Sequence, residues 1–162
     1  MNPAFPAFRQ RLFHPVRFRL FLLQQLPAAL IAGVRIHSLE EEQTVIKATY
    51  SWINRNPFRS MYFAVQSMAA EMSTGLLATG QVYQRKPSVS LMVVGLEAKF
   101  IKKVTGAVFF TCKDGAAIAA TIERAIAAGE PQTIGCIATG TDESGTTVSE
   151  FVITWSFKAK QG

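Results

Sequence analysis

The carboxylate of Glu71 stands alone in the most apolar segment of the chain. Residues 61–77 are mainly alanine, methionine, leucine and aromatic side chains, and Glu71 is the one charged residue among them. A carboxylate in apolar surroundings is costly unless it is paired, and partial burial raises its pKa. Such a group is suited to activate water or to attack an acyl carbon. The alternative is a structural carboxylate, either paired with a lysine or arginine or placed on an exposed strip of the helix.

Polar residues precede this apolar segment. Asn54, Asn56 and Ser60 could orient water or a substrate oxygen, although asparagine and serine are also the usual residues of turns and helix N-caps. Ser60 is the predicted N-cap of a helix that starts at Met61. Free backbone N–H groups in the first turn, aided by the helix dipole, could stabilise an oxyanion.

Two further polar residues lie inside the segment. Gln66 and Ser67 could line a pocket or simply satisfy neighbouring backbone groups. Met68 and Met72 would make a groove along the same helix apolar and adaptable.

The histidines and cysteines do not have the spacing of a catalytic or metal-binding motif. His14 and His37 lack the spacing of metal ligands, so we expect no metal site. Cys112 and Cys136 form no CxxC motif and are predicted to be small core residues on strands. The sequence also has no phosphate-binding loop, dinucleotide fingerprint or nucleophile elbow.

The composition predicts one globular domain. With 162 residues, 49% of them hydrophobic and 17% charged, residues 1–162 suffice for a single core and are too weakly charged for a disordered chain. The net charge of +6 favours anionic partners such as nucleic acid, lipid headgroups or a phosphate-bearing molecule. Two cysteines are too few for a disulfide framework and no signal peptide is evident, so we expect free thiols and a cytoplasmic location.

The N-terminal region mixes arginines with aromatic side chains. We expect residues 1–8 to form a flexible arm. Residues 8–23 are typical of a helix with arginines in water and phenylalanines on a sheet, and Pro15 either breaks this helix or occupies a first turn. A nucleic-acid or membrane-surface site is the alternative, but we expect no nucleic-acid partner. Two glutamines and Pro27 interrupt the apolar run well short of the ~20 residues of a membrane span.

The remaining sequence predicts a buried helix among antiparallel strands. The helix from Met61 to Leu77 is apolar nearly all round, which is typical of a buried helix. Strand-like segments joined without long helical crossovers favour an antiparallel sheet that encloses it. A short alanine-rich helix, 116–128, should end at Gly129. The predicted strands cover residues 34–39, 44–50, 88–95, 105–112, 133–141 and 147–158.

This order of elements, with an Asn-Pro-x-x-Ser-Met-Tyr motif at residues 56–62 leading into the apolar helix, resembles the hotdog superfamily. More closely, it resembles a branch that is labelled as a domain of unknown function and is related to thioesterases. The resemblance covers roughly residues 20–160 and implies an α+β hotdog fold, a long central helix wrapped by an antiparallel sheet, here with an extra N-terminal helix. It also implies a homodimer or a higher oligomer, because hotdog sheets commonly join edge to edge.

The resemblance further implies where a site would lie. In thioesterases of the phenylacetate-degradation type, a His-Gly-Gly motif opens the central helix, and a catalytic Asp or Glu lies nine residues after the His. Here the motif falls on Tyr62-Phe63-Ala64 and the ninth residue after Tyr62 is Glu71, so the carboxylate is present while the histidine and both glycines are replaced. The resemblance thus implies Glu71 as the catalytic carboxylate and Tyr62, Phe63 and Ala64 as the oxyanion motif. Together with the polar and apolar residues considered above, the candidate catalytic residues are Glu71, Asn56 and Ser60, and the candidate oxyanion and substrate-binding residues are Tyr62, Phe63, Ala64, Gln66, Ser67 and Met68.

Two functions from different classes follow. The first is a hydrolase of acyl-CoA or acyl-carrier thioesters, with coenzyme A as part of the substrate and no separate cofactor. The second is a non-catalytic protein that binds a fatty acyl or other apolar ligand, which the lost His-Gly-Gly motif and the methionine-rich helix favour. A dehydratase would need a histidine beside an acid, and neither histidine lies near the central helix in sequence. Basic residues that could meet coenzyme A phosphates, or form ordinary solvated surface, are Arg85, Lys86, Lys99, Lys102 and Lys103.

Overall fold

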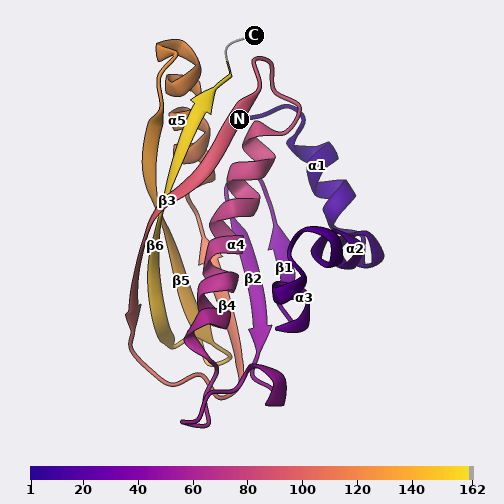
Figure 1. The fold of residues 1–162 in the computed structure, drawn as a ribbon, viewed down its shortest axis with the longest axis vertical. Coiled ribbons are helices and arrows are strands. Elements are labelled where there is room, and N and C mark those ends of the chain that lie inside the picture. Colours follow the sequence, from indigo (N-terminus) through magenta and orange to yellow (C-terminus); the bar gives the residue numbers. More distant parts are fainter. Residues whose placement is uncertain (161–162) are drawn as a thin grey trace.

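An antiparallel sheet and one long helix dominate the computed structural model, which describes residues 1–160 (Figure 1). Within these residues the sheet has six strands in the hydrogen-bonded order β1-β2-β4-β5-β6-β3, and all neighbouring strands are antiparallel. Helix α4 (Phe63–Val82) runs along one face of this sheet, which confirms the predicted α+β architecture. The strands are β1 (Arg35–Leu39), β2 (Thr44–Thr49), β3 (Val89–Phe100), β4 (Ala107–Cys112), β5 (Gln132–Asp142) and β6 (Thr147–Ala159).

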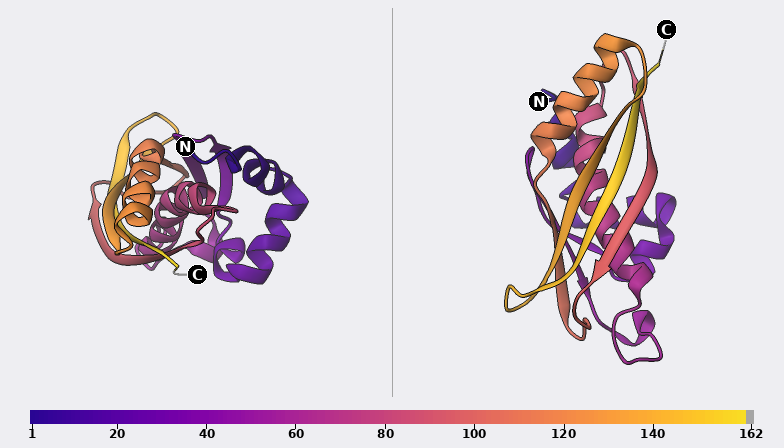
Figure 2. Two further views of the ribbon diagram at one scale, coloured as in Figure 1. Left: turned by 90° about the horizontal axis from the view of Figure 1, so that it is seen from above. Right: turned by 90° about the vertical axis from the view of Figure 1, so that its left-hand side faces the viewer.

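The sequence of α4 explains why it is both helical and buried. Its alanine, leucine, methionine and glutamine residues favour helix, and no proline interrupts it. Apolar or small side chains occupy nearly every side of the helix, so it can contact the sheet, the N-terminal helices and α5 (Gly115–Ala128) at once (Figure 2). Helix α5 ends at Gly129, whose φ of +68° is the left-handed cap that the sequence predicted.

The sheet follows from alternating patterns in the C-terminal half. Along β6, buried side chains such as Phe151, Ile153, Trp155 and Phe157 alternate with more accessible ones, as expected when only one face meets the core. The predicted turn between β5 and β6 is also present, with Gly145 at a φ of +83°. These two strands therefore form the hairpin that the sequence indicated.

Several boundaries differ from the prediction, and helix α4 continues to Val82 instead of ending at Leu77. Helix α4 begins at Phe63 rather than at Met61, and its N-cap residue is Tyr62, which makes no side-chain cap. Ser60 is not the cap, because its backbone and hydroxyl are already hydrogen-bonded to Asn56 in the preceding loop. Strand β3 is longer than predicted, since its pairing with β6 continues to Phe100.

The N-terminus is anchored rather than flexible, which corrects the predicted arm at residues 1–8. Asn2 is buried; its backbone N–H donates to Gln81 Oε1 at 2.9 Å, and its Nδ2 donates to the carbonyl oxygens of Gly80 and Tyr83, each at 2.8 Å. Phe5 is fully buried at the start of α1 (Phe5–Leu12). These bonds join residues nearly 80 positions apart, so no local sequence pattern reports them.

Two more helices, α2 (Pro15–Gln25) and α3 (Pro27–Ile31), pass over the outer side of α4 and β1 (Figure 1). Pro15 occupies the first turn of α2. Phe18 and Leu22 are buried while Arg17 and Arg19 are exposed, which is the amphipathic packing that we expected. Among residues 1–160, no helix is both long and apolar enough to cross a membrane.

Candidate functional site

Glu71 lies in a small apolar pocket between α4 and the junction of α2 with α3. The pocket has a volume of about 220 Å³. Met68 and Met72 belong to its α4 wall, and residues 25–29 form the opposite wall. The sequence did not indicate this second wall, because the α2–α3 junction is more than 40 residues away from Glu71 along the chain.

Burial raises the pKa of Glu71 above its ordinary value of 4.5, since the ionised carboxylate loses water there. The ion pairs within residues 1–160 join Arg9 to Glu40, Arg85 to Glu123 and Lys102 to Asp142, so Glu71 has no cationic partner in the described chain. This excludes the lysine or arginine partner that the structural alternative required within one chain.

Gly75 leaves room for the Glu71 side chain. The Glu71 Oε1 atom lies 2.9 Å from the point where a Cβ on residue 75 would be, and the indole of Trp155 lies 3.2 Å from the same point. A larger residue one helical turn after Glu71 would therefore displace the carboxylate, the indole or both. The absence of a Cβ at Gly75 therefore gives the Glu71 carboxylate space beside the Trp155 indole.

A hydrogen-bonded chain fixes the helical turn beneath Glu71. The Trp155 Nε1–H donates to Thr74 Oγ1 at 2.9 Å, and the Thr74 hydroxyl donates to the Glu71 carbonyl oxygen at 2.9 Å. This chain ties the turn that carries Glu71 to strand β6.

A second pocket, the N-terminal pocket, lies at the start of α4 and has a volume of about 300 Å³. Its walls come from the loop before α4, the first turns of α4 and the segment from Phe100 to Val104. The sequence-predicted residues that line it are Asn56, Ser60, Phe63 and Gln66. Lys103 contributes positive charge to the same pocket, while the Lys102 ammonium, also at its wall, is paired with Asp142 at 2.9 Å.

Asn56 and Ser60 bond mainly to each other and to their own loop. Asn56 Oδ1 accepts hydrogen bonds from the backbone N–H groups of Phe58 and Ser60, and Asn56 Nδ2 donates to Ser60 Oγ at 3.1 Å. Asn54 is buried and donates to the carbonyl oxygens of Ala32 and Thr49. These contacts fix the conformation of the loop that precedes α4.

The polar residues inside α4 are also positioned by specific contacts. Gln66 is buried, and its Oε1 accepts a hydrogen bond from Ser149 on β6 at 2.9 Å. Within residues 1–160 the Gln66 amide nitrogen forms no hydrogen bond, and the side chain lines the N-terminal pocket. Ser67 donates back to the Phe63 carbonyl oxygen at 3.1 Å, so its hydroxyl serves the helix itself.

One face of α4 remains accessible between the two pockets. Tyr62 and Phe63, at the start of this face, are about half exposed. The partly accessible residues that follow along it, at the three- and four-residue spacing of one helix face, are Ala64, Ser67, Met68 and Glu71. Phe63 and Glu71 are separated by about 12 Å along the helix axis. A single chain thus places Glu71 in a different pocket from Asn56 and Ser60.

The remaining candidate residues, two cysteines and a histidine, are buried or packed against other side chains. Cys112 and Cys136 are buried, and burial raises the pKa of the Cys112 thiol to about 12. The His37 ring packs edge-on against Phe109 with centroids 5.2 Å apart. Across the part of the chain that the structure describes, no three His, Cys, Asp or Glu side chains come together as a metal site.

Comparison with known proteins gives a family and a fold. The model of the family described as "Domain of unknown function (DUF4442)" matches residues 16–157. No curated protein matches the chain.

Solved structures share the arrangement at low sequence identity. A protein of unknown function from Pseudomonas aeruginosa, described as a probable thioesterase, has a TM-score of 0.76 and 19% identity over 90% of this chain and 97% of its own. A thioesterase from Haemophilus influenzae has a TM-score of 0.59 and 12% identity over 86% of this chain and 88% of its own. The PaaI protein of Escherichia coli, from the phenylacetic acid degradation operon, has a TM-score of 0.63 and 12% identity over 96% of this chain and 97% of its own.

At these identities the structural likeness establishes the fold and leaves the substrate open. The likeness in fold confirms the resemblance to the hotdog superfamily that was indicated by the residues before and within the central helix. The family match covers most of the chain, and the protein therefore belongs to the DUF4442 family and has the hotdog fold of thioesterases.

Proposed function

We propose that this protein hydrolyses acyl thioesters, with Glu71 as the catalytic carboxylate. The observation that carries the proposal is an unpaired, partly buried carboxylate in an apolar pocket on the central helix. Its pKa is raised by burial, toward the range in which a general base works well near neutral pH. Gly75 would leave space for the carboxyl group, and the Trp155–Thr74 chain would hold the helical turn that carries it.

The reaction needs a base and an oxyanion site. Ionised Glu71 takes a proton from water, and the resulting hydroxide adds to the thioester carbonyl carbon. The tetrahedral intermediate collapses with cleavage of the C–S bond, and the thiolate leaves and gains a proton from solvent or from Glu71. Alternatively, Glu71 attacks the carbonyl carbon itself and expels the thiolate, which gains a proton from solvent. Water then hydrolyses the resulting mixed anhydride, which releases the carboxylic acid and restores Glu71.

The start of α4 is the proposed oxyanion site. Tyr62 provides no side-chain cap, so the first backbone N–H groups of the helix, at Phe63 and Ala64, are available to a ligand. The helix dipole favours negative charge there. The free amide nitrogen of Gln66 adds a donor in the same pocket, while Ser67 and Met68 would contact the acyl group along the accessible face of α4. Asn56 and Ser60 would hold the loop that shapes this pocket.

A second copy of the chain would bring the two pockets together. Strand β3 is the sheet edge beside α4, and its side chains are largely exposed on both faces, including Met92, Val94 and Leu96. A long apolar edge strand is a template for pairing with another strand. Pairing of two β3 edges would set the accessible face of one α4 beside that of the other, so that Glu71 of one copy could act at the N-terminal pocket of its partner. We therefore propose a homodimer with shared sites.

The proposed substrate class follows from the positive charge beside the N-terminal pocket and from the apolar lining of the Glu71 pocket. Lys103 beside the N-terminal pocket and the net charge of +6 suit the phosphates of coenzyme A or of an acyl-carrier arm. The methionines near Glu71 suit an apolar acyl chain.

Hydrolysis is tested by thiol release from short, long and aromatic acyl-CoAs. We expect turnover by the native protein, a loss of at least about 100-fold in Glu71→Gln, and native turnover in Glu130→Gln, which neutralises an exposed glutamate outside both pockets. Circular dichroism checks that both variants fold. Turnover unchanged in Glu71→Gln would reject the catalytic role of this carboxylate.

The second candidate function is non-catalytic binding of an apolar ligand. The observation that favours it is the almost wholly apolar lining of the Glu71 pocket, in a chain that lacks the His-Gly-Gly motif. Saturable binding of a non-hydrolysable acyl thioether, together with no thiol release from any acyl-CoA, would favour this function over hydrolysis.

A further inference from the structure

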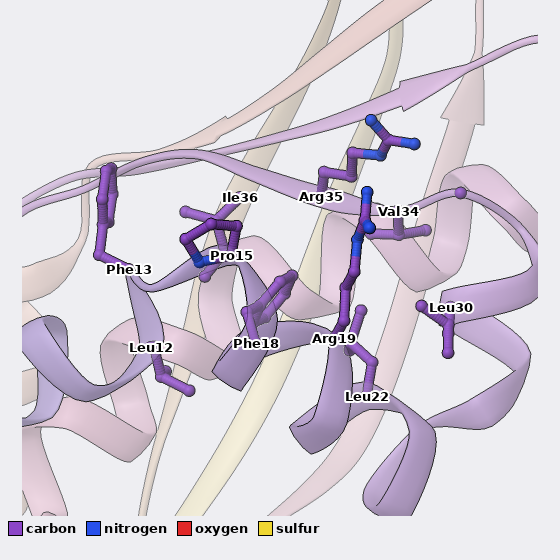
Figure 3. Close-up of a pocket in the computed structure, with 11 residues that line it drawn as sticks. Leu12, Phe13, Pro15, Phe18, Arg19, Leu22, Leu30, Val34, Arg35 and Ile36 are labelled. Atoms are coloured by element: carbon purple, nitrogen blue, oxygen red, sulfur yellow. The ribbon is translucent and has the colours of Figure 1, made fainter.

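A larger pocket, the arginine pocket, lies between the N-terminal helices and strand β1. Its volume is about 470 Å³, within the range of small-molecule sites. Figure 3 shows side chains from α1, α2, α3 and the start of β1 around it. Its apolar lining includes Leu12, Phe18, Leu22, Leu30, Val34 and Ile36.

Two arginines stand at one end of this pocket. Arg19 comes from α2 and Arg35 from the first position of β1, and Figure 3 shows the Arg19 guanidinium directed toward the start of β1, where Arg35 lies. The ion pairs within residues 1–160 include neither arginine, and no aspartate or glutamate lines the pocket. The positive charge at this end therefore has no protein counter-charge.

A third cation lies across the strand pair from Arg35, outside the pocket lining. Lys47 of β2 is the cross-strand partner of Arg35, so the two side chains emerge on the same face of the sheet, where the Lys47 ammonium lies 5.2 Å from the centre of the Phe109 ring. Like charges directly opposite each other destabilise a strand pair. An anion bound beside Arg35 would relieve this repulsion, and guanidinium groups bind carboxylates and phosphates in bidentate geometry.

We infer that the arginine pocket binds an amphiphile that has an anionic carboxylate or phosphate head and an unbranched apolar tail. The head lies between Arg19 and Arg35, and the tail lies against Leu22, Leu30 and the neighbouring apolar side chains. This site shares no lining residue with the Glu71 pocket, so the inference does not rest on the proposed hydrolysis. The α2–α3 segment separates the two pockets, with Leu22 and Leu30 on one side and the junction at residues 25–29 on the other.

Isothermal titration calorimetry tests the site with four probes below their micellar concentrations. Laurate and dodecyl phosphate carry the tail with each anionic head, dodecyltrimethylammonium carries the tail with a cationic head, and acetate carries a head without a tail. We expect one binding event per chain for laurate, dodecyl phosphate or both, and much weaker binding of the other two probes. Whichever of laurate and dodecyl phosphate binds more tightly shows whether the site prefers a carboxylate or a phosphate head group. Equal binding of the cationic probe would overturn the inference.

Matched variants test whether the amphiphile binds in the arginine pocket. Arg19→Gln and Arg35→Gln should each weaken binding by about tenfold, and the double variant by more, because each removes a charged hydrogen-bond donor. Arg17→Gln removes the same charge two residues away on α2 and does not line the pocket, so it should bind as the native protein does. Both pocket arginines are exposed, so these variants are expected to fold, and thermal melts check this.

Two more variants separate this site from the Glu71 pocket. Leu30→Trp fills the tail region and should weaken binding of the anionic amphiphile by about tenfold or more. Glu71→Gln should leave that binding unchanged. Binding that survives the double arginine variant, or that is lost in Glu71→Gln alone, would assign the amphiphile to another site and reject the inference.

Discussion

The indole nitrogen of Trp155 and the hydroxyl of Thr74 are 2.9 Å apart, and their hydrogen bond joins strand β6 to the turn of α4 that carries Glu71. Both residues are buried, so water cannot replace either partner if the other is removed. The bond links two elements that are 81 positions apart in sequence. The helical turn that carries the candidate carboxylate is thus held by a polar contact within the core.

Replacing Thr74 tests this contact. Thr74→Val keeps the shape of the side chain but leaves the Trp155 N–H without an acceptor, so we expect the free energy of unfolding to fall by about 1–3 kcal/mol. Urea unfolding followed by tryptophan fluorescence measures the change. Thr74→Ser keeps the hydroxyl and should lose less, and Thr105→Val, at an exposed position, should lose almost nothing. A Thr74→Val variant as stable as the native protein would show that the bond contributes no net stability.

The raised pKa of Glu71 predicts a pH dependence of stability. The folded state holds the Glu71 proton more tightly than the unfolded state, whose glutamate has the ordinary pKa of 4.5. We therefore compare the free energy of unfolding of the native protein with that of Glu71→Gln. The difference between the two should not change with pH below about pH 4, and the native protein should lose stability relative to the variant as the pH rises from 4.5 through the raised pKa of the folded state. Above that pKa the difference stays constant. Urea unfolding of both proteins between pH 4 and pH 8 measures it, and a difference that is flat with pH would contradict the raised pKa.

If Glu71 is a general base, activity should show the opposite pH trend. The reaction needs the ionised carboxylate, so thioester turnover should rise with pH through the raised pKa of Glu71 and then level off. A pH profile of kcat/KM on the best acyl-CoA measures this rise. A profile without an inflection above pH 4.5 would point to another base.

Gly80 provides a test of the anchored N-terminus. A Cβ at this position would overlap the Phe5 ring and come within 3.0 Å of Phe8, so Gly80→Ala should displace α1 and cost about 1–3 kcal/mol of stability. Limited proteolysis should then cut within residues 1–12 much faster than in the native protein. Combining Gly80→Ala with Phe5→Ala should cost less than the sum of the single changes, because the smaller side chain removes the overlap. Equal proteolysis of Gly80→Ala and native protein would mean that α1 does not pack as described.

The exposed edge strand β3 predicts the oligomeric state. Met92 on β3 is 64% exposed, and Met92→Lys should prevent pairing of two β3 edges by adding charges that repel across the pair. We expect sedimentation velocity to show a dimer for the native protein and a monomer of 17.8 kDa for the variant. Ile137→Lys is the matched control, because Ile137 is 56% exposed but belongs to β5 inside the sheet. A monomeric native protein would contradict the proposed shared site.

Local patterns were sufficient to predict most of the elements. The apolar composition before and after Glu71 predicts a long buried helix, and the structure has α4 there. Gly129 and Gly145 end a helix and turn a hairpin through backbone conformations that only glycine adopts easily, so they can be recognised without tertiary contacts. Alternation along β6 likewise depends on neighbouring residues alone.

The site could be predicted only in part. Glu71 is recognisable in the sequence because a lone carboxylate in an apolar helix is unusual. The apolar wall opposite it, near Pro27, is not recognisable, since it comes from a distant segment that folds back over α4. Ser60 has the residue type of an N-cap, yet its contact with Asn56 moves the start of the helix to Phe63.

The sequence by itself thus determined the α+β class, the buried central helix and the unusual carboxylate, because these depend on composition and on periodicity within single segments. Only the tertiary structure decided that Asn2 anchors the N-terminus to Gly80 and Gln81, and that Arg19 and Arg35 share a pocket. These relationships depend on how separate segments meet in space. That meeting is set by the packing of the whole core, and no short stretch of sequence encodes it.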